Sequence, residues 1–422
     1  MTSDSRILRT YVTLTFLSTL ASSFIWGINT LFLLDARLSI TQAFAANAFF
    51  TAGQVLFEVP TGVVADMLGR RASYLLGAAT LFVSTLLYYW MWWLRGPFWA
   101  WAVISMLLGL GFTFFSGATE AWLVDGLKST NYRGTIDSAF AKGQIAAGIA
   151  MLGGTLVGGV IAQATNLGVP YIVRSATLAL TFLVAFVAMR DVGFTPRVGA
   201  SLPREVGRIL QASLEHGFRN APVRWLMLAA PFGGGVAIYA FYAMQPYLLG
   251  LYGRSESYAT AGVAAAIVAG AQIAGGYLVP YAPRLFRRRT TLLLIGGVVS
   301  AAALLVIGLV PNFAAVLTLL GLWALVFAAI MPVTQAYLNG LIPSEERATV
   351  LSSYNLLGSA GGVVFQPALG RVADIWGYAS SYLVAAGIQL LELPFVLLAR
   401  RERAPADPME VTDAGQVTSS PS

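Results

Sequence analysis

Three glutamates lie well inside long apolar runs, where a charged side chain is costly. Glu58, Glu120 and Glu392 are each surrounded in the sequence by hydrophobic residues. A carboxylate at the centre of a bilayer costs about 2.5–3.5 kcal/mol on insertion scales, so it needs a partner or a water-filled cavity. Burial favours the neutral form of a carboxyl group, which is the form that a proton carrier needs near neutral pH. These residues are therefore candidates for proton transfer, with a structural anchor as the alternative.

The local sequence separates these candidates. A proline follows Glu58 two residues later and predicts a bend in the helix, and both interpretations stay open for this glutamate. Glu120 is similar but lies nearer to the end of its run. Glu392 lies on the last apolar run, where we expect an anchoring role. Asp35 ends its run two residues before Arg37, which favours a surface ion pair, with a proton port as the alternative.

A short charged loop separates the second apolar run from the third. It reads Gly62-Val63-Val64-Ala65-Asp66-Met67-Leu68-Gly69-Arg70-Arg71. This loop resembles the signature loop of the major facilitator superfamily, Gly-x-x-x-Asp-Arg/Lys-x-Gly-Arg-Arg/Lys, with Met67 in place of the usual base. The resemblance implies a membrane transporter built from two six-helix halves.

The resemblance also implies a gate on one side of the membrane. Asp66 would cap the N-terminus of the eleventh helix, whose positive dipole end attracts an anion. Arg70 or Arg71 would pair with Asp125 at the end of the fourth helix. The alternative is a loop that only holds positive charge on one side. The expected gate residues are Gly62, Asp66, Gly69, Arg70, Arg71 and Asp125.

The composition indicates an integral membrane protein that is entirely α-helical. Hydrophobic residues make up 57% of the chain and charged residues 11%, whereas soluble domains carry about 25% charged residues. Apolar runs of about 20 residues recur from end to end, and each can cross a hydrocarbon core of about 30 Å. The twelve expected spans lie near 11–34, 41–65, 73–94, 98–122, 138–163, 169–190, 224–249, 258–281, 290–310, 313–340, 349–372 and 378–399.

Basic residues predict the orientation of these spans. Twenty of the Lys and Arg residues fall on the side of the termini, four fall on the other side, and Lys142 and Arg174 lie inside helix ends. The positive-inside rule then places both termini in the cytoplasm. The scarcity of lysine indicates a GC-rich bacterial genome, so we expect a multi-pass protein of the plasma (inner) membrane.

A long polar stretch divides the twelve spans into six and six. We expect an N-terminal half at 1–190, a cytoplasmic linker at 191–223 that contains a surface helix, a C-terminal half at 224–400 and a disordered tail at 401–422. At one fixed offset, Asp125-Gly126-Leu127 matches Asn339-Gly340-Leu341 without gaps. Duplication explains these matches better than chance, and repeated halves with a central site are typical of transporters that work by alternating access.

A second resemblance lies on the fifth span. Ala150-x-x-x-Gly154-Thr155-x-x-Gly158-Gly159 is similar to the superfamily's antiporter motif, with Ala150 and Thr155 departing from its usual Gly and Pro. We expect these small residues to let the fifth helix approach the eighth closely. The proton-relay arginine that the superfamily often carries on the fourth helix is replaced by Ser105.

Polar and aromatic residues on the helices that line the superfamily's central cavity predict a substrate site. An aromatic and weakly polar cavity suits lipophilic or amphipathic molecules, although single aromatic residues more often contact lipid. The candidates are Trp26, Asn29, Phe112, Phe115, Tyr239, Tyr242, Gln245, Trp323, Gln335 and Asn355.

These observations favour proton-coupled efflux of lipophilic or amphipathic compounds by a secondary transporter, most like the drug:proton antiporter branch. The alternative is a proton symporter or facilitator that takes up a small metabolite. An enzyme is disfavoured, because the chain has one histidine and no cysteine, and no nucleotide-binding loop supports an ATP-driven pump. We expect a small-molecule substrate, protons and the lipid bilayer as partners, a monomer, no cofactor or metal, and no nucleic acid.

Overall fold

The computed structural model describes residues 3–115, 117–130, 132, 134–194, 202–254 and 256–409, nearly all of them in helices. The N-terminal half contains α1 (Ser3–Trp26), α2 (Asn29–Asp35), α3 (Ile40–Leu68), α4 (Arg70–Leu94), α5 (Phe98–Phe115), α6 (Ala118–Ser129), α7 (Ile136–Ala164) and α8 (Val169–Ala188). The C-terminal half contains α10 (Ala221–Tyr252), α11 (Tyr258–Leu278), α12 (Ala282–Leu285), α13 (Arg289–Leu309), α14 (Phe313–Asn339), α15 (Arg347–Leu390) and α16 (Leu393–Arg401). Between the halves lies α9 (Leu202–Ala212), which continues into a π-helical turn at Ser213–Phe218.

Twelve membrane crossings account for these elements. Within the described ranges, ten helical segments are long and apolar enough to span a membrane, and the bent pair α1 and α2 makes an eleventh. One of the ten, Arg347–Arg401, has 55 residues, far more than the roughly 20 that one crossing needs. The chain turns back within it at Gly377, where φ is +81°. The twelve-helix architecture in two halves therefore matches the prediction.

The first crossing is broken rather than continuous. Helices α1 and α2 meet at an angle of 48°, which frees backbone groups that must find partners inside a membrane. The Gln245 side chain of α10 pairs with one backbone carbonyl and one backbone N–H beside the break. Its amide donates to the carbonyl oxygen of Trp26 at 2.7 Å, and its oxygen accepts from the N–H of Thr30 at 2.8 Å. A residue of the C-terminal half thus holds the break in the N-terminal half.

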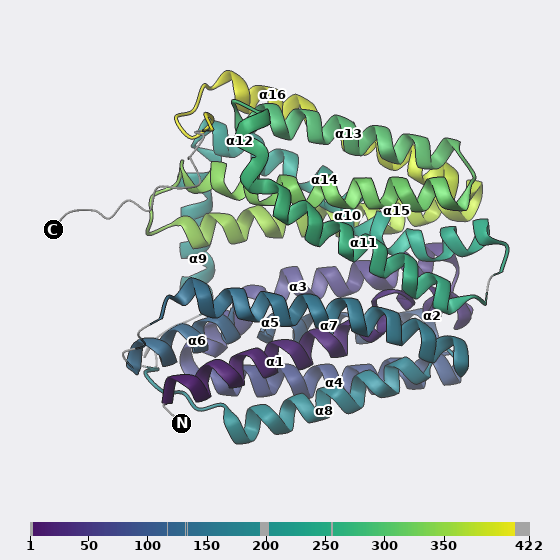
Figure 1. Cartoon of the computed structure of the whole chain (residues 1–422), viewed down its shortest axis with the longest axis horizontal. Helices are drawn as coiled ribbons and strands as arrows, with labels where there is room; N and C mark the ends of the chain where they lie inside the picture. Colours follow the sequence, from purple (N-terminus) through teal and green to yellow (C-terminus); the bar gives the residue numbers. More distant parts are fainter. Residues whose placement is uncertain are drawn as a thin grey trace.

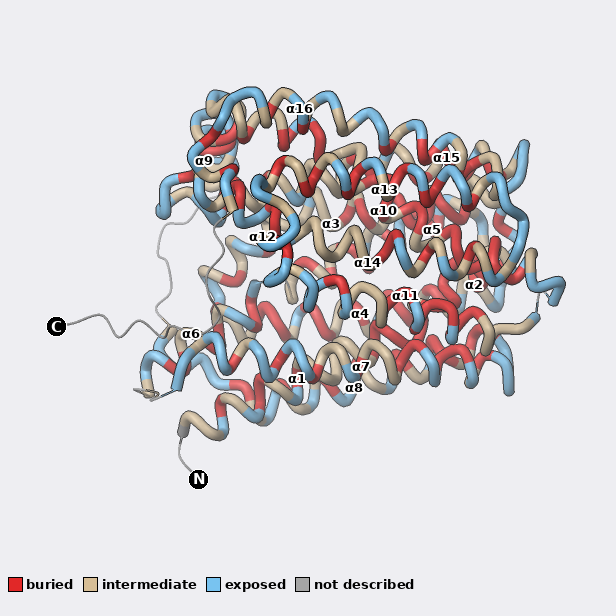
Figure 2. Tube along the Cα trace, turned by 45° about the horizontal axis from the view of Figure 1, so that its top comes forward, coloured by how far each residue is buried: buried red, intermediate tan, exposed pale blue. Residues whose placement is uncertain are grey.

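The two halves form two bundles that meet at one end and part at the other. Figure 1 shows α1–α8 in one bundle and α10–α16 in the other, with both termini and α9 at the same end. Figure 2 shows buried residues where helices face one another and exposed residues along the outer faces. Many of these exposed residues are apolar, such as Val187, Trp99 and Ile149, as expected for a surface that contacts lipid. We call the end with the termini the termini side and the opposite end the far side.

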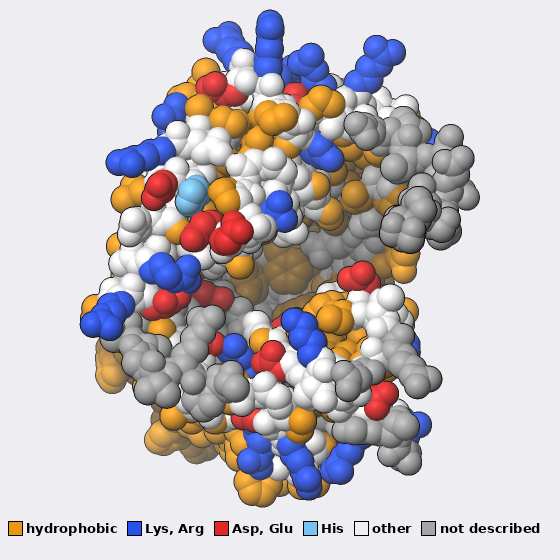
Figure 3. Space-filling view, turned by 90° about the vertical axis from the view of Figure 1, so that its left-hand side faces the viewer, with side chains coloured by type: hydrophobic (Ala, Val, Ile, Leu, Met, Phe, Trp, Pro, Cys, Tyr) orange, Lys and Arg blue, Asp and Glu red, His pale blue; other side chains and the backbone are white. Residues whose placement is uncertain are grey.

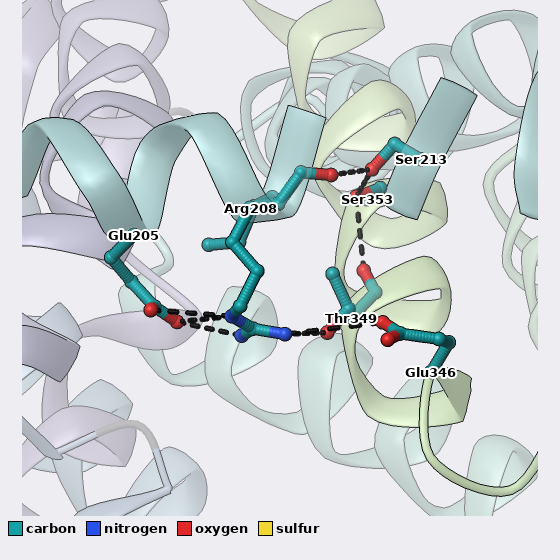
Figure 4. A network of polar contacts seen from close by, with 7 residues as sticks. Glu205, Arg208, Ser213, Glu346, Thr349 and Ser353 are labelled. Atoms are coloured by element: carbon teal, nitrogen blue, oxygen red, sulfur yellow. Dashed lines mark hydrogen bonds and ion pairs between the residues drawn. The ribbon is translucent and has the colours of Figure 1, made fainter. Parts of the chain in front are cut away.

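Helix α9 docks on the first turns of α15 (Figure 4). The Arg208 guanidinium pairs with Glu205 of its own helix at 2.6 Å and donates to the hydroxyl of Thr349 at 3.3 Å. One turn deeper, the hydroxyls of Ser213 and Ser353 lie 2.6 Å apart in a buried contact. The expected surface helix of the linker is therefore present and attached to the C-terminal half, while residues 195–201 of the linker lie outside the described residues.

The prediction of a disordered tail is wrong for the first residues of that tail, 401–409. Asp407 is buried, its backbone oxygen accepts from the N–H of Arg289 at 2.8 Å, and its carboxylate accepts from the N–H of Thr290 at 2.9 Å. Met409 donates its backbone N–H to Arg287. The start of the tail is ordered because it caps the N-terminus of α13. Residues 410–422 lie outside the described residues.

Candidate substrate cavity

A cavity of about 470 Å³ lies between the two bundles. One wall comes from α3, with Phe50, Thr51 and Gln54, and the rest comes from the C-terminal half. Figure 3 looks at the termini side and shows the molecule hollowed between the bundles, with hydrophobic side chains inside. The aromatic side chains of the wall are Phe50, Phe241, Tyr242, Trp323, Phe327 and Tyr354. The cavity is large enough for an organic molecule and mostly apolar, as small-molecule sites usually are.

Glu392 is the sole charged side chain in the wall of this cavity, in the described part of the chain. The helix breaks at Leu391 and Glu392, just before Pro394, and α16 begins at Leu393. Two glycines leave room for the carboxylate: a Cβ on Gly297 of α13 would lie 2.8 Å from Oε1, and one on Gly233 of α10 would collide with Oε2. Glu392 therefore lies in the wall of the cavity between the bundles, and the anchoring role expected for it stays a prediction.

Glu58 and Glu120 line a different cavity, within the N-terminal half. This second cavity has about 490 Å³ and is bounded by α1, α3, α5 and α6. It shares Gln54 with the first cavity, so the two lie next to each other. Asp35 lies in neither. Its carboxylate accepts from the indole N–H of Trp92 at 2.7 Å, so its partner is that indole and not the expected Arg37.

Seven of the ten cavity candidates lie in the walls of these spaces or of a small third cavity between them. They are Trp26, Asn29, Phe112, Phe115, Tyr242, Trp323 and Asn355. The structure places the other three elsewhere. Tyr239 is buried in the core of the C-terminal half and donates to Ser381 at 2.5 Å, Gln245 holds the break in the first crossing, and Gln335 is exposed on the outer face of α14.

The charged loop on the termini side is arranged within the N-terminal half. Asp66 pairs with Arg70 at 2.7 Å, one helical turn away. Arg71 donates its backbone N–H to the carboxylate of Asp191 at 2.9 Å and its guanidinium to the carbonyl of Phe186 at 2.7 Å. Burial raises the pKa of the Asp191 carboxyl, while the N–H and charge of Arg71 act in the opposite direction.

The pairs expected across the gate are therefore not formed in this conformation. Neither Arg70 nor Arg71 pairs with Asp125, because Asp191 follows the sixth crossing directly and reaches the start of α4 instead. The space between the bundles is open on this side (Figure 3). Of the remaining gate residues, Gly62 is exposed on α3 and Gly69 has a φ of +100° between α3 and α4.

Comparison with known proteins assigns a family to this arrangement. The family model described as Major Facilitator Superfamily matches residues 11–287 and 280–420. The chain belongs to the major facilitator superfamily. No curated protein sequence matches it closely enough to narrow this further.

Solved structures of the superfamily share the fold at low sequence identity. A mutant of the nucleoside transporter NupG is similar with a TM-score of 0.76 and 14% identity, over 93% of this chain and 99% of that one. An inward-facing bacterial homologue of the human lysosomal transporter Spinster has a TM-score of 0.71 and 16% identity, over 94% and 97%. A D-xylose–proton symporter has a TM-score of 0.68 and 16% identity, over 93% and 96%. These likenesses show the fold, and membership of the superfamily makes the chain a secondary transporter.

The residues of the antiporter-like motif on α7 pack against two helices, α1 and α11, and not against the eighth crossing alone. Ala150 is buried on α7, and a Cβ on Gly154 or Gly158 would collide with α1 at Ser23 and Phe24. Gly159 faces the eighth crossing, since its Cβ would lie 2.9 Å from Cα of Gly262 on α11, and the backbone oxygen of Thr155 lies beside the same glycine. Close approach of α7 to α11 joins the two halves, whereas the rest of the motif holds the N-terminal half together.

Asp374 joins the two halves of the protein, and the sequence analysis did not single it out. It lies on α15 near the far side, and its carboxylate accepts from the N–H of Ile40 at 3.0 Å and of Thr41 at 2.9 Å, at the N-terminus of α3. The signal that could have found it is a repeat of the signature loop: Ala65-Asp66-x-x-Gly69 recurs as Ala373-Asp374-x-x-Gly377. Both glycines have positive φ and both precede a turn of the chain.

Arg174 is a second residue that the prediction missed. It was placed in a helix end, yet it is 2% exposed and lines the third cavity, of about 50 Å³. Its Nε donates to the hydroxyl of Thr85 at 3.1 Å, and its guanidinium lies over the ring of Phe112 at 5.8 Å. A single arginine in an apolar run is the signal, because such a residue marks a functional site by default.

Proposed function

We propose that this chain exchanges protons for amphipathic organic molecules by alternating access, with Glu392 as the proton-carrying group. We call the cavity between the two bundles the main cavity. The observation that supports this proposal is the position of Glu392, the one charged side chain among the described residues that line it. A lone carboxyl group in an apolar wall can be neutral when it holds a proton and attract a positive group when it does not. Proton and substrate would then compete for one site, which is what an exchanger requires.

The transport cycle follows from this competition. In the conformation described here, Glu392 faces a cavity that is hollowed toward the termini side. A substrate with a cationic end would enter, displace the proton from Glu392 and place its apolar body against Trp323 and Phe327. Closure of the termini side and opening of the far side would then expose the carboxylate to protons that release the substrate.

We propose efflux as the direction of transport. The wall combines six aromatic side chains with amide and hydroxyl groups such as those of Gln54, Gln272 and Asn355, and a mostly apolar surface with a few polar anchoring groups suits amphipathic compounds. Lys and Arg side chains are spread over the termini side, with Asp and Glu side chains among them (Figure 3), and the abundance of basic residues supports a cytoplasmic location for that side. The chain would then act as a monomer in the plasma membrane and export compounds away from the cytoplasm.

Proteoliposomes with an imposed pH gradient and a trapped pH dye test this function. Addition of a lipophilic cation such as tetraphenylphosphonium should collapse the gradient in wild-type protein, and Glu392→Gln should abolish that collapse. Glu58→Gln and Glu120→Gln are matched controls, because both carboxylates line the neighbouring cavity. Collapse that survives in Glu392→Gln but not in a control would move the proton site to that control residue. No collapse with any cation would favour a facilitator or a symporter for uptake.

A further inference from the structure

The third cavity lies in the N-terminal half, next to the main cavity. It has about 50 Å³, which is room for a few atoms, since a water molecule takes about 30 Å³ of liquid. It shares Phe50 and Tyr242 with the main cavity. A molecule that fills the main cavity could therefore extend one small group into the third cavity.

The polar groups around this space leave donors without acceptors. Tyr171 donates to Asn29 at 3.0 Å, and Asn29 donates to the side-chain oxygen of Asn47 at 2.9 Å. The amide nitrogen of Asn47 is buried and has no hydrogen-bond partner. The side-chain oxygens of Asn29 and Asn47 each accept one of these hydrogen bonds, and the amide nitrogen of Asn47 remains as an unpaired donor. Buried donors are almost always paired, so Asn47 indicates a missing acceptor.

Arg174 adds a charge to this unpaired donor. Its hydrogen bond to Thr85 uses only Nε, and the guanidinium carries further N–H donors in a fixed fork. Among the described residues no carboxylate lies within ion-pair distance of it. The ionisable side chains that surround it are the tyrosines Tyr88, Tyr171 and Tyr242. An arginine buried in a membrane without a counter-ion is costly, and an anion from outside the chain would offset that cost.

We propose that Arg174 and Asn47 bind a carboxylate of the transported molecule. The fork geometry of a guanidinium matches a carboxylate through two parallel hydrogen bonds, and the size of the cavity limits the group to a small one. The inference rests on the proposed function and narrows its substrate class: the cationic end lies at Glu392, the apolar body fills the main cavity, and the carboxylate lies on Arg174. The substrate would then be an amphipathic zwitterion.

A pair of dyes tests the carboxylate site: a rhodamine with a free carboxylate and the methyl ester of the same dye. Equilibrium binding to purified wild-type protein should favour the free acid by about tenfold, the size expected for a charge-assisted hydrogen bond. Arg174→Gln should lose that preference through weaker binding of the acid, with binding of the ester unchanged. Arg174→Lys keeps the charge and should keep a preference for the acid.

The outcomes separate this inference from the proposed function. Wild-type protein that binds acid and ester equally, or Arg174→Gln that weakens both equally, overturns the carboxylate site and assigns Arg174 a structural role. Proton exchange driven by the ester and lost in Glu392→Gln would still support the exchanger in that case. If Arg174→Gln does not fold, Asn47→Leu removes the second donor and should weaken binding of the acid several-fold while sparing the ester. An unchanged ratio in Asn47→Leu would count against the site.

Discussion

The carboxylate of Asp374 accepts hydrogen bonds from both the backbone N–H, at 2.9 Å, and the hydroxyl of Thr41. Asp374 lies on α15 of the C-terminal half and Thr41 in the first turn of α3 of the N-terminal half. The contact places an anion at a helix N-terminus, where the dipole and free N–H groups favour it. It joins the halves on the far side with the same chemistry that the signature loop would use on the termini side, where Asp66 would meet the start of α15 once that side closes.

Asp374→Asn should shift the protein toward the conformation that is open on the far side. An amide keeps the size of the side chain but loses the charge, and hydrogen bonds to charged groups contribute about 1.5–3 kcal/mol. A loss of about 1.4 kcal/mol changes the ratio of the two conformations about tenfold. Spin labels at Arg37→Cys and Arg254→Cys, in far-side loops of the two halves, would report a longer distance by double electron–electron resonance. The chain has no native cysteine, so these labels are the sole ones. An unchanged distance distribution would contradict the role of Asp374.

Asp66→Asn should act in the opposite direction. In this conformation Asp66 makes a partly exposed ion pair with Arg70, and such pairs contribute about 0–1 kcal/mol. Its larger contribution is expected when the termini side closes and Asp66 meets the start of α15. The variant should therefore fold and insert normally, keep the far-side distance short and lose transport. A turnover rate equal to that of wild type in proteoliposomes would show that Asp66 does not act as a gate residue in transport.

The sequence predicted the fold well because the bilayer imposes lengths that can be counted. Twelve apolar runs gave twelve crossings, including the turn near Gly377 within α15. The break after Trp26 was not predicted. No proline marks it, and the side chain that compensates for it, Gln245, comes from the other half. Breaks of this kind depend on contacts that a single run does not reveal.

The site was predicted in part because composition names residue types but not the rotation of a helix. Tyr242 faces the cavity, whereas Tyr239, three residues earlier on α10, faces the core and bonds to Ser381. For Glu392 the sequence favoured an anchoring role, since nothing in it shows that Gly233 and Gly297 leave space for the carboxylate in the cavity wall. Helix rotation is set by packing against neighbours, and close packing comes from residues far apart in the chain.

Gly233→Ala should impair proton coupling without removing any titratable group. The added methyl group would occupy the space of Glu392 Oε2 and push the carboxylate out of its position in the cavity wall. Gly250→Ala is the matched control on the same helix, because nothing lies within 4 Å of its added Cβ. Substrate-driven proton movement in proteoliposomes should fall at least several-fold in the first variant and stay at the wild-type level in the second. Equal rates in both variants would show that the position of Glu392 does not matter for coupling.

The contact between α9 and α15 should depend more on Ser353 than on Arg208. The Arg208 side chain is 50% exposed, so its ion pairs contribute about 0–1 kcal/mol. The Ser213–Ser353 hydrogen bond is buried, and such a bond contributes about 0.5–1.5 kcal/mol, while Ser213 keeps its hydrogen bond to the carbonyl oxygen of Ile209 at 2.7 Å when Ser353 is replaced. Thermal unfolding in detergent should show a larger decrease in Tm for Ser353→Ala than for Arg208→Ala (Figure 4). A larger effect of Arg208→Ala would mean that the exposed pairs, and not the buried hydroxyls, hold the linker helix.

Asp407 should stabilise the C-terminal half from outside the membrane spans. Its carboxylate accepts from the N–H of Thr290 in the first turn of α13, and loss of such a cap costs about 0.5–2 kcal/mol. Asp407→Ala should therefore lower the Tm, whereas Asp407→Asn keeps an acceptor at the same place and should lower it less. Hydrogen exchange gives the more specific measurement, because the amides at the start of α13 should lose protection in Asp407→Ala while those of α4 do not. Equal exchange in both regions would show that the tail rests on α13 without holding it.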